Sequence, residues 1–503
     1  MKQYRYKELA ESFISSINEG VFQTGDKLPG IRSVCRQEDV SAATAVAAYS
    51  LLEEGGYVEA RPRSGFYVSA RTESHLIEPD VSDPVLQPNL VRGQDLVLRL
   101  IQSLRHPDVV QLGAAIPADE YLPLRQVQQL ISELTLQSGK SITSVPVDDL
   151  EGNLLSGNNS SQRSYLSQYT LPGLPVLRQQ LAKHMRNAGC EIKADDVVVT
   201  AGCQEAIYLT LKTLTNPGDI IAVESPTFYG FLQAIESLGL KVLEIPTHPK
   251  TGISLDALQL AVEQWPIKVC LVMPTFGNPV GSCMPEENKI KLVGLATEHD
   301  FHVIEDDIYG DFSFDQRRPK SLKAFDDSER VIYCSSFSKS ISPGLRLGWV
   351  VSAQFKKELV YQKFISSCAT SSLSQVVIEK FLSGGHYKKH MRSMRMLIEN
   401  SVKKMINAVE DYFPMDTKIT QPNGGFVLWV ELPKTINTLE LANQAIAHNI
   451  SIAPGKLFSA TKKYDHCLRL SCAVVWSKKI ENSVKTVGKL LSQSSQSNQS
   501  TSD

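Results

Sequence analysis

The sequence of 503 residues has little net charge, no regular cysteine pattern and no long apolar run. A net charge of −2 gives no overall positive field, so any contact with nucleic acid would have to come from local groups. The nine cysteines form no CxxC pair, which favours reduced thiols over disulfides or a metal site. The N-terminus is charged where a signal peptide needs an apolar run, and no stretch reaches transmembrane length. We therefore expect a cytoplasmic protein with no membrane partner.

The first seventy or so residues predict three short helices followed by a two-stranded hairpin. Apolar residues at helical spacing, among them Leu9, Phe13 and Ile17, define the first helix, which stops at Gly20. A tight turn before Ile31 and an N-cap at Ser41 start the next two helices. We expect these helices at about 31–38 and 42–54, and strands at 57–60 and 66–68 around a basic turn at 61–65.

The rest of the chain predicts a linker and a large second domain. Residues 72–90 contain three prolines and few core formers, as expected of a linker. Beyond them, short apolar runs alternate with helical patterns, which predicts an α/β fold with a largely parallel sheet. The polar, low-complexity residues 490–503 predict a disordered tail. The expected domains are therefore 1–71 and 91–489, joined by the linker.

One lysine, Lys339, lies in a run of hydroxyl residues, with Arg346 seven positions further on. A lysine amine condenses with an aldehyde cofactor to give a Schiff base, while Ser336, Ser338 and a guanidinium are natural ligands for a phosphate dianion. This combination points to pyridoxal phosphate. Most lysines are solvated surface charges, so a plainly structural Lys339 is the alternative, and partners elsewhere in the chain decide between the two.

Segments that follow predicted strands supply candidates for the other contacts of this cofactor. Cys203 and Gln204 open a helix, whose N-terminal amides and dipole favour phosphate. Asp306 could keep the pyridine nitrogen protonated, which makes the ring an electron sink, and Tyr309 could reach the ring oxygen. Because ligands of an open α/β sheet bind outside the carboxyl ends of its strands, these positions fit one shared site.

Three further residues complete the set. Asn278, in a turn stiffened by Pro279, could donate to the ring oxygen, and Phe228 could stack on the ring. Arg469 lies between apolar residues near the C-terminus, where a bidentate guanidinium would suit a substrate carboxylate. Each signal is weak alone, because such residues are more often structural. Their joint order over five segments is improbable by coincidence.

On these motifs, the region from about 109 to 489 resembles the fold-type I aminotransferases of the class I/II group. The resemblance implies a large domain with a mostly parallel sheet, a small C-terminal α/β domain, pyridoxal 5′-phosphate as cofactor and a homodimer. It implies that Lys339 is the Schiff-base lysine and that Lys339, Asp306 and Tyr309 are catalytic. The expected cofactor-binding residues are Lys339, Cys203, Gln204, Phe228, Asn278, Asp306, Tyr309, Ser336, Ser338 and Arg346, and the expected effector- or substrate-binding residues are Arg469 and Asn278.

The front module resembles the winged helix-turn-helix of GntR-type regulators in residues 25–32, 40–44 and 61–68. Joined to an aminotransferase-like domain, it makes the whole chain resemble the MocR-type regulators. In winged modules the third helix enters the major groove of DNA and the wing approaches the backbone or the minor groove. The expected contacts with double-stranded DNA are Arg32, Ser41, Thr44, Arg61, Arg63 and Gly65.

The charge balance of this module predicts modest DNA affinity. Residues 1–72 hold nine Lys or Arg and nine Asp or Glu, so few phosphate contacts and a shallow salt dependence are expected. A winged helix used only for protein contacts is the alternative.

The two resemblances together imply a transcription regulator that binds an operator and senses an amine or amino acid through external aldimine formation. The apparently complete catalytic set keeps a second hypothesis open, namely a working aminotransferase of the EC 2.6.1 type with an appended module. Turnover with a keto acid would distinguish the second hypothesis from the first.

Overall fold

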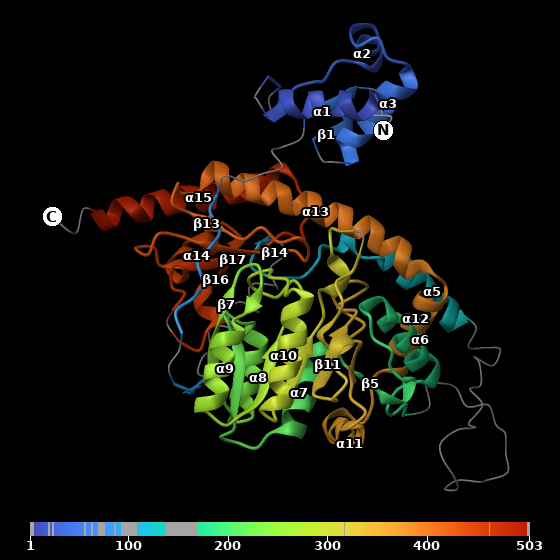
Figure 1. The fold of residues 1–503 in the computed structure, drawn as a ribbon, viewed down its shortest axis with the longest axis vertical. Helices are drawn as coiled ribbons and strands as arrows, with labels where there is room; N and C mark the ends of the chain where they lie inside the picture. The colour runs from blue at the N-terminus through green and yellow to red at the C-terminus, as the bar shows by residue number, and fades with distance from the viewer. Residues whose placement is uncertain are drawn as a thin grey trace.

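The N-terminal module consists of three helices and a hairpin at the positions that the sequence predicts (Figure 1). Its elements are α1 (Arg5–Asn18), α2 (Ile31–Gln37), α3 (Ala42–Glu54), β1 (Val58–Arg61) and β2 (Gly65–Val68), with β1 and β2 antiparallel. Ser41 caps α3, because its Oγ accepts a hydrogen bond from the Thr44 amide at 3.1 Å. Tyr49 is fully buried in the module's own core and donates its hydroxyl to the Pro29 carbonyl at 2.5 Å.

The computed structural model describes most of the chain. The described residues are 5–18, 21–22, 25–54, 57–61, 64–68, 76–84, 87–91, 108–136, 169–315, 317–461 and 463–499. Within them no helix is long and apolar enough to cross a membrane.

A nine-stranded mixed sheet forms the centre of the second domain, with the order β3-β7-β6-β9-β10-β11-β12-β5 and with β8 paired to β7. The five central strands, from β7 to β11, run parallel, and β12 and β5 add antiparallel neighbours. The strands are β3 (Asn89–Leu90), β5 (Val197–Thr200), β6 (Ile220–Ser225), β7 (Lys241–His248), β8 (Gly252–Ile253), β9 (Ile267–Val272), β10 (His302–Asp306), β11 (Val331–Ser336) and β12 (Gly348–Val351). The mostly parallel sheet expected from the sequence is confirmed.

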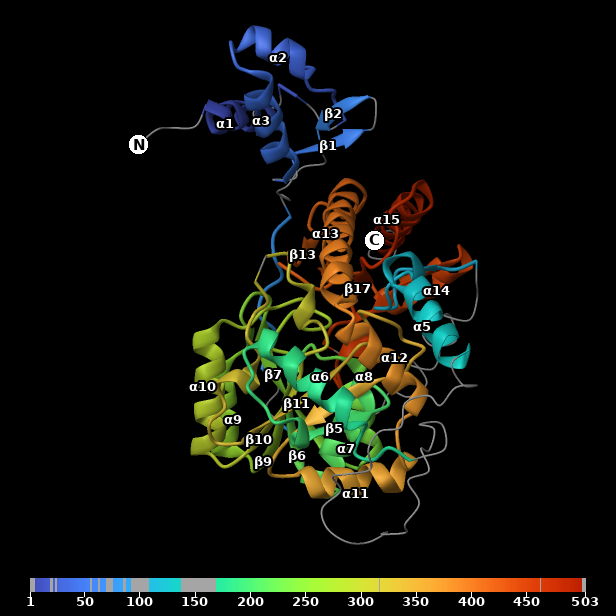
Figure 2. The ribbon, with the colours of Figure 1, turned by 90° about the vertical axis from the view of Figure 1, so that its right-hand side faces the viewer.

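Helices cover both faces of this sheet (Figure 2). In β6, Ile220 and Ala222 belong to one apolar core and Ile221 and Val223 to the other, which explains why residues 220–223 are all apolar and buried. Helices α9 and α10 pack on the first face, and α7 and α8 on the second. The helices around the sheet are α5 (Leu124–Leu136), α6 (Pro175–Met185), α7 (Cys203–Leu214), α8 (Tyr229–Ser237), α9 (Leu255–Gln264), α10 (Glu286–Glu298), α11 (Lys356–Ser367) and α12 (Ser372–Ser383).

A smaller C-terminal part packs against the sheet through a four-stranded antiparallel sheet of order β13-β14-β17-β16 and through long helices (Figure 1). A separate parallel pair joins β4 to β15. The elements are β4 (Val110–Gln111), β13 (Lys418–Ile419), β14 (Val427–Glu431), β15 (Ile450–Ser451), β16 (Ala453–Pro454), β17 (Cys467–Ser471), α13 (His386–Tyr412), α14 (Thr438–Ala447) and α15 (Lys478–Gln499). Short 3₁₀ turns include η6 (Gly310–Phe312), η7 (Leu322–Phe325) and η8 (Gly455–Phe458).

Two segments differ from the expected linker and tail. Residues 76–84 lie against the second domain, where the Ile419 amide donates to the Ile77 carbonyl at 3.0 Å, and β3 pairs with β7. The segment is therefore bound over much of its length. Helix α15 continues to Gln499, past the expected boundary at 490, and Val484, Val487 and Leu491 bury an apolar side of the helix up to residue 491. The division into domains at 71 and 91 stays a prediction.

Close backbone packing where β12 meets β11 gives a test of this arrangement. A β-carbon at Gly348 would lie 2.5 Å from the Gly202 carbonyl carbon and 2.7 Å from the Ser335 oxygen, whereas one at Gly344 meets nothing closer than Ser342 Oγ at 3.6 Å. We expect Gly348→Ala to lower the free energy of unfolding by about 1–3 kcal/mol through overpacking. Gly344→Ala should leave it nearly unchanged. Equal denaturation midpoints for the two variants would contradict this packing.

Candidate functional site

A cavity of about 200 Å³ lies where the carboxyl ends of several strands meet. The end of β10 contributes Asp306, the end of β11 contributes Ser336, and the loop after it contributes Lys339. Every cofactor and effector position expected from the sequence lines this space, together with several neighbours. The lining residues are Ala114, Ala115, Ile116, Cys203, Gln204, Phe228, Tyr229, Met273, Asn278, Asp306, Ile308, Tyr309, Ser336, Ser338, Lys339, Arg346 and Arg469.

Lys339 extends into the cavity and donates from Nζ to the Ala115 carbonyl at 2.5 Å. Burial first, and then the nearby cation Arg469, lower the pKa of this amine to about 8, while Asp306 acts in the opposite direction. An appreciable fraction of an amine with this pKa is unprotonated near neutral pH. Lys339 is therefore suited to attack an aldehyde, since only the unprotonated form is a nucleophile.

Asp306 is 3% exposed and accepts hydrogen bonds at Oδ1 from the Cys203 thiol at 3.2 Å and the Ile308 amide at 3.1 Å. Burial raises the pKa of its carboxyl to about 7, against the opposite effects of these hydrogen bonds and of Lys339. A cationic N–H brought into the cavity would stabilise the ionised form of this buried carboxyl.

Hydroxyl and guanidinium groups also line the cavity. Ser336 and Ser338 are buried, and Arg346 reaches Ser338 Oγ at 3.4 Å and the Ala201 carbonyl at 2.6 Å. Helix α7 begins at Cys203, and Cys203 and Gln204 of its first turn line the same cavity. Hydroxyls, a guanidinium and a helix N-terminus together form a site for a dianion.

Arg469 is fully buried in β17, where its Nη1 donates to Asn278 Oδ1 at 3.0 Å and its Nη2 donates to the Gly113 carbonyl. Its Nε is buried without a hydrogen-bond partner among the described residues, and no carboxylate of these residues pairs with it. Burial lowers the pKa of this guanidinium. A buried guanidinium with spare donor capacity fits a ligand carboxylate.

Two aromatic residues complete the walls of the cavity. Tyr309 is 2% exposed and packs edge-on against Phe426, and burial raises the pKa of its phenol. Phe228 lies at the start of α8 with its ring centroid 4.6 Å from that of Tyr229, so either ring is available to a planar ligand.

The donor set fits pyridoxal phosphate. Lys339 would hold its aldehyde carbon, Asp306 its ring nitrogen, Asn278 and Tyr309 its ring oxygen, and the start of α7 its phosphate. Two features of this chain support the fit. A protonated ring nitrogen would pair with Asp306, whose pKa burial raises, and a ligand carboxylate would accept a hydrogen bond from Arg469 Nε, which has no partner among the described residues. When bound, this cofactor supplies an aldehyde and an electron-withdrawing ring.

Sequence reasoning missed the residues of the cavity that carry no reactive group. The Ala115 carbonyl and Ile116 come from an apolar loop before α5, and Met273 follows β9. Nothing in their residue types indicates a site. Tyr229, next to the expected Phe228, also lines the cavity.

The expected DNA-contacting residues that the structure describes lie on the surface of the N-terminal module. Arg32 and Gly65 are exposed, and Ser41 and Thr44 join through their hydroxyls at 2.8 Å at the start of α3. Arg61 pairs with Glu59 at 2.7 Å and lies over the Tyr67 ring at 4.2 Å. To bind a DNA phosphate, Arg61 would have to break its ion pair with Glu59 or contact both groups at once. Arg63 lies outside the described residues.

The lowered pKa of Lys339 predicts the pH at which it becomes reactive. Acylation of the cofactor-free, full-length protein, followed by mass spectrometry of the Lys339 peptide, should reach half of its maximal rate near pH 8. An unstructured lysine peptide, with a pKa of about 10.4, serves as reference. Because Arg469 contributes to the shift, Arg469→Gln should move the midpoint upward, but not as far as the reference. A wild-type midpoint equal to that of the peptide would contradict the assignment.

Comparison with known proteins finds a matching family for each of the two parts of the chain. Residues 146–487 match the family of class I and II aminotransferases, and residues 5–68 match the gntR family of bacterial regulatory proteins. Among solved structures, the fold is similar to kynurenine aminotransferase of Pyrococcus horikoshii, with a TM-score of 0.70 and 28% identity over 80% of this chain and 95% of that one. It is also similar to the α-aminoadipate aminotransferase LysN of Thermus thermophilus, solved with N-(5′-phosphopyridoxyl)-L-leucine, with a TM-score of 0.68 and 25% identity over 78% and 95% of the two chains.

Two full-length relatives share the same combination of parts. The HTH-type transcriptional regulators YjiR and YdcR of Escherichia coli strain K12 are each 35% identical to this chain. YjiR aligns over 96% of this chain and 98% of its own length, and YdcR over 97% and 99%. The chain therefore belongs to the MocR-type regulators, in which a GntR-type helix-turn-helix precedes a fold-type I aminotransferase domain whose family uses pyridoxal phosphate.

Proposed function

We propose that this protein is a cytoplasmic, homodimeric transcription regulator that binds double-stranded DNA and senses an amine or amino acid through pyridoxal phosphate held at Lys339. The observation that carries the proposal is the presence, in one chain, of a winged helix-turn-helix and a cavity with the full donor set for this cofactor. The relatives YjiR and YdcR, which are named as HTH-type regulators, support the DNA-binding half.

The sensing half rests on the chemistry of the cavity. An effector amine would compete with Lys339 for the aldehyde carbon of the cofactor, and the buried Arg469 would select effectors that carry a carboxylate. A carboxylate there would satisfy the Nε that lacks a partner among the described residues. The effector is therefore an amino acid or a related amine with an acidic group.

A homodimer suits the DNA-binding half of the proposal. One module with balanced charges makes few phosphate contacts. Two linked modules bind one DNA more tightly than either alone, because the second module binds at a high effective concentration. A two-fold symmetric protein would also match an operator with two half-sites.

Coupling between the two halves would run through residues 76–84, the docked part of the linker. On the large sheet, Glu78 pairs with Lys250 at 2.9 Å, and Ser82 Oγ donates to the Ser225 carbonyl at 3.1 Å. On the C-terminal part, Asp80 pairs with Lys418 at 2.6 Å. Since the segment is tied to both parts, a ligand that shifts one against the other would move the chain that leads to the DNA-binding module.

The proposal is tested by fluorescence anisotropy of the cofactor-loaded protein on duplex DNA from upstream of its own gene, against a scrambled duplex at equal salt. We expect preferential binding to the upstream duplex, and we expect Lys339→Ala to abolish the visible absorbance of bound cofactor while the protein stays folded. No preference, combined with keto-acid-dependent turnover at an enzymatic rate, would favour the aminotransferase hypothesis instead.

The linker contacts predict a selective loss of coupling. Ser82→Ala removes a hydrogen bond worth about 0.5–1.5 kcal/mol, so the effector-dependent change in DNA affinity should shrink about two- to tenfold. Cofactor binding and effector-free DNA binding should keep their wild-type values. The matched control is Ser492→Ala, whose hydroxyl bonds to the Gly488 carbonyl within α15. An unchanged effector response in Ser82→Ala would exclude this route.

A further inference from the structure

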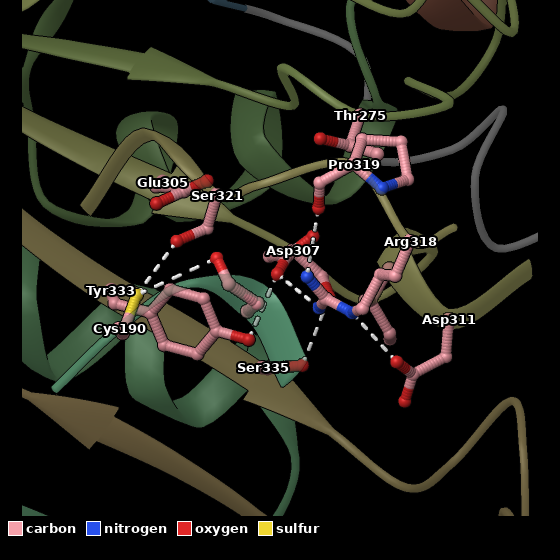
Figure 3. Close-up of polar contacts among 12 residues, drawn as sticks. Cys190, Thr275, Glu305, Asp307, Asp311, Arg318, Pro319, Ser321, Tyr333 and Ser335 are labelled. Atoms are coloured by element: carbon pink, nitrogen blue, oxygen red, sulfur yellow. Dashed lines mark hydrogen bonds and ion pairs between the residues drawn. The ribbon is translucent and has the colours of Figure 1, made fainter. Parts of the chain in front are cut away.

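A buried ion triad of Asp307, Arg318 and Asp311 fixes the loop that follows Asp306 (Figure 3). Arg318 donates from Nη2 to Asp307 Oδ2 at 2.5 Å and from Nε to Asp311 Oδ1 at 2.6 Å. The side chains of Asp307, Arg318 and Asp311 are 0%, 9% and 14% exposed. Figure 3 shows the guanidinium between the two carboxylates, so one cation fixes two points of the same loop.

The loop from Asp306 to Asp311 faces two ways. Asp306 and Tyr309 line the cavity, whereas Asp307 and Asp311 point to Arg318 behind it. At the end of β10 the side chains of Asp306 and Asp307 point to opposite faces, as in any extended strand. The turn that follows brings Tyr309 to the cavity, and Asp311, in η6, contacts Arg318. Whatever fixes Asp307 and Asp311 therefore also fixes the direction of Asp306 and Tyr309.

Further contacts brace both carboxylates. The Tyr333 hydroxyl donates to Asp307 Oδ2 at 2.9 Å, and Tyr387 donates to Asp311 Oδ2 at 2.5 Å, beside His184 Nε2 at 3.3 Å. Burial disfavours the ionised form of Asp311, but Arg318 and His184 outweigh it and hold the pKa of that carboxyl well below its usual range. The Asp311 carboxylate is thus ionised.

The backbone at Gly310 packs closely against the triad. A β-carbon at Gly310 would overlap Asp307 Oδ1 and would lie 2.5 Å from Arg318 Nη2. Asp307 Oδ1 is itself buried without a hydrogen-bond partner among the described residues. Without Arg318, two carboxylates would remain buried with no matching cation in the triad, and the loop would have to move to hydrate them.

We propose that Arg318 is a positioning residue for the cofactor site: by holding Asp307 and Asp311 from behind, it sets the aim of Asp306 at the ring nitrogen and of Tyr309 at the ring oxygen. This inference rests on the proposed binding of pyridoxal phosphate. Arg318 does not line the cavity, so its effect on the cofactor passes through the loop.

The test uses the full-length protein and two readouts, the Kd for pyridoxal phosphate and the pH midpoint of the visible band of bound cofactor. Arg318→Met should raise the Kd about tenfold or more, equivalent to at least about 1.4 kcal/mol. The band midpoint should move to higher pH, because positive charge near Lys339 is lost when Asp306 no longer holds a protonated ring nitrogen. Arg318→Lys keeps the charge but cannot bridge two carboxylates as a fork, so it should raise the Kd by less.

The control is Arg330→Met, which breaks a pair with the exposed Asp300 at 2.6 Å. It should leave both readouts at wild-type values, whatever its effect on unfolding. Folded Arg318→Met that behaves like the control would overturn the proposal, and if that variant does not fold, wild-type readouts in Arg318→Lys would do so. A wild-type protein that binds no pyridoxal phosphate would instead overturn the proposed function itself.

Discussion

The burial of unlike charges around one small cavity is the constraint on which the rest of the structure depends. Lys339, Asp306 and Arg469 all lose solvation at the strand ends, and among the described residues no ion pair joins any two of them. Burial therefore moves the pKa values of Lys339 and Asp306 toward each other, to about 8 and about 7. Burying unpaired charges lowers the free energy of unfolding unless a ligand supplies the opposite charges. This is typical of a binding site and not of a hydrophobic core.

Strands of the large sheet and the loops braced against them hold these charged side chains in fixed positions. Parallel strands end at one edge and bring Asp306 and Ser336 together, Gly348 lets β12 approach the turn at Gly202, and the Arg318 triad closes the back of the loop. The linker is held by the same framework, because Ser82 bonds to the carbonyl of Ser225, which ends β6 three residues before Phe228. Cavity, sheet and linker are therefore connected by direct contacts.

The parts that could be predicted from the sequence are those encoded by local patterns. The Ser41 cap and the helical spacing of apolar residues placed α3 correctly, and motifs after apolar strands identified Lys339, Asp306 and Asn278 as neighbours in one cavity. The contacts that could not be predicted join distant segments. Asp80 contacts Lys418, 338 positions away in the sequence, and the Cys203 thiol contacts Asp306, 103 positions away. A local sequence pattern cannot predict either contact.

The central claim is that occupancy of the cavity changes the affinity for DNA. It is tested most directly by titrating one sample of cofactor-loaded protein on its upstream duplex with amino acids, while recording the absorbance of the bound cofactor and the anisotropy of the DNA together. The account predicts that an amino acid which changes the absorbance also changes the anisotropy, with the same half-saturating concentration. An amino acid that converts the absorbance completely while the DNA affinity stays constant would contradict it.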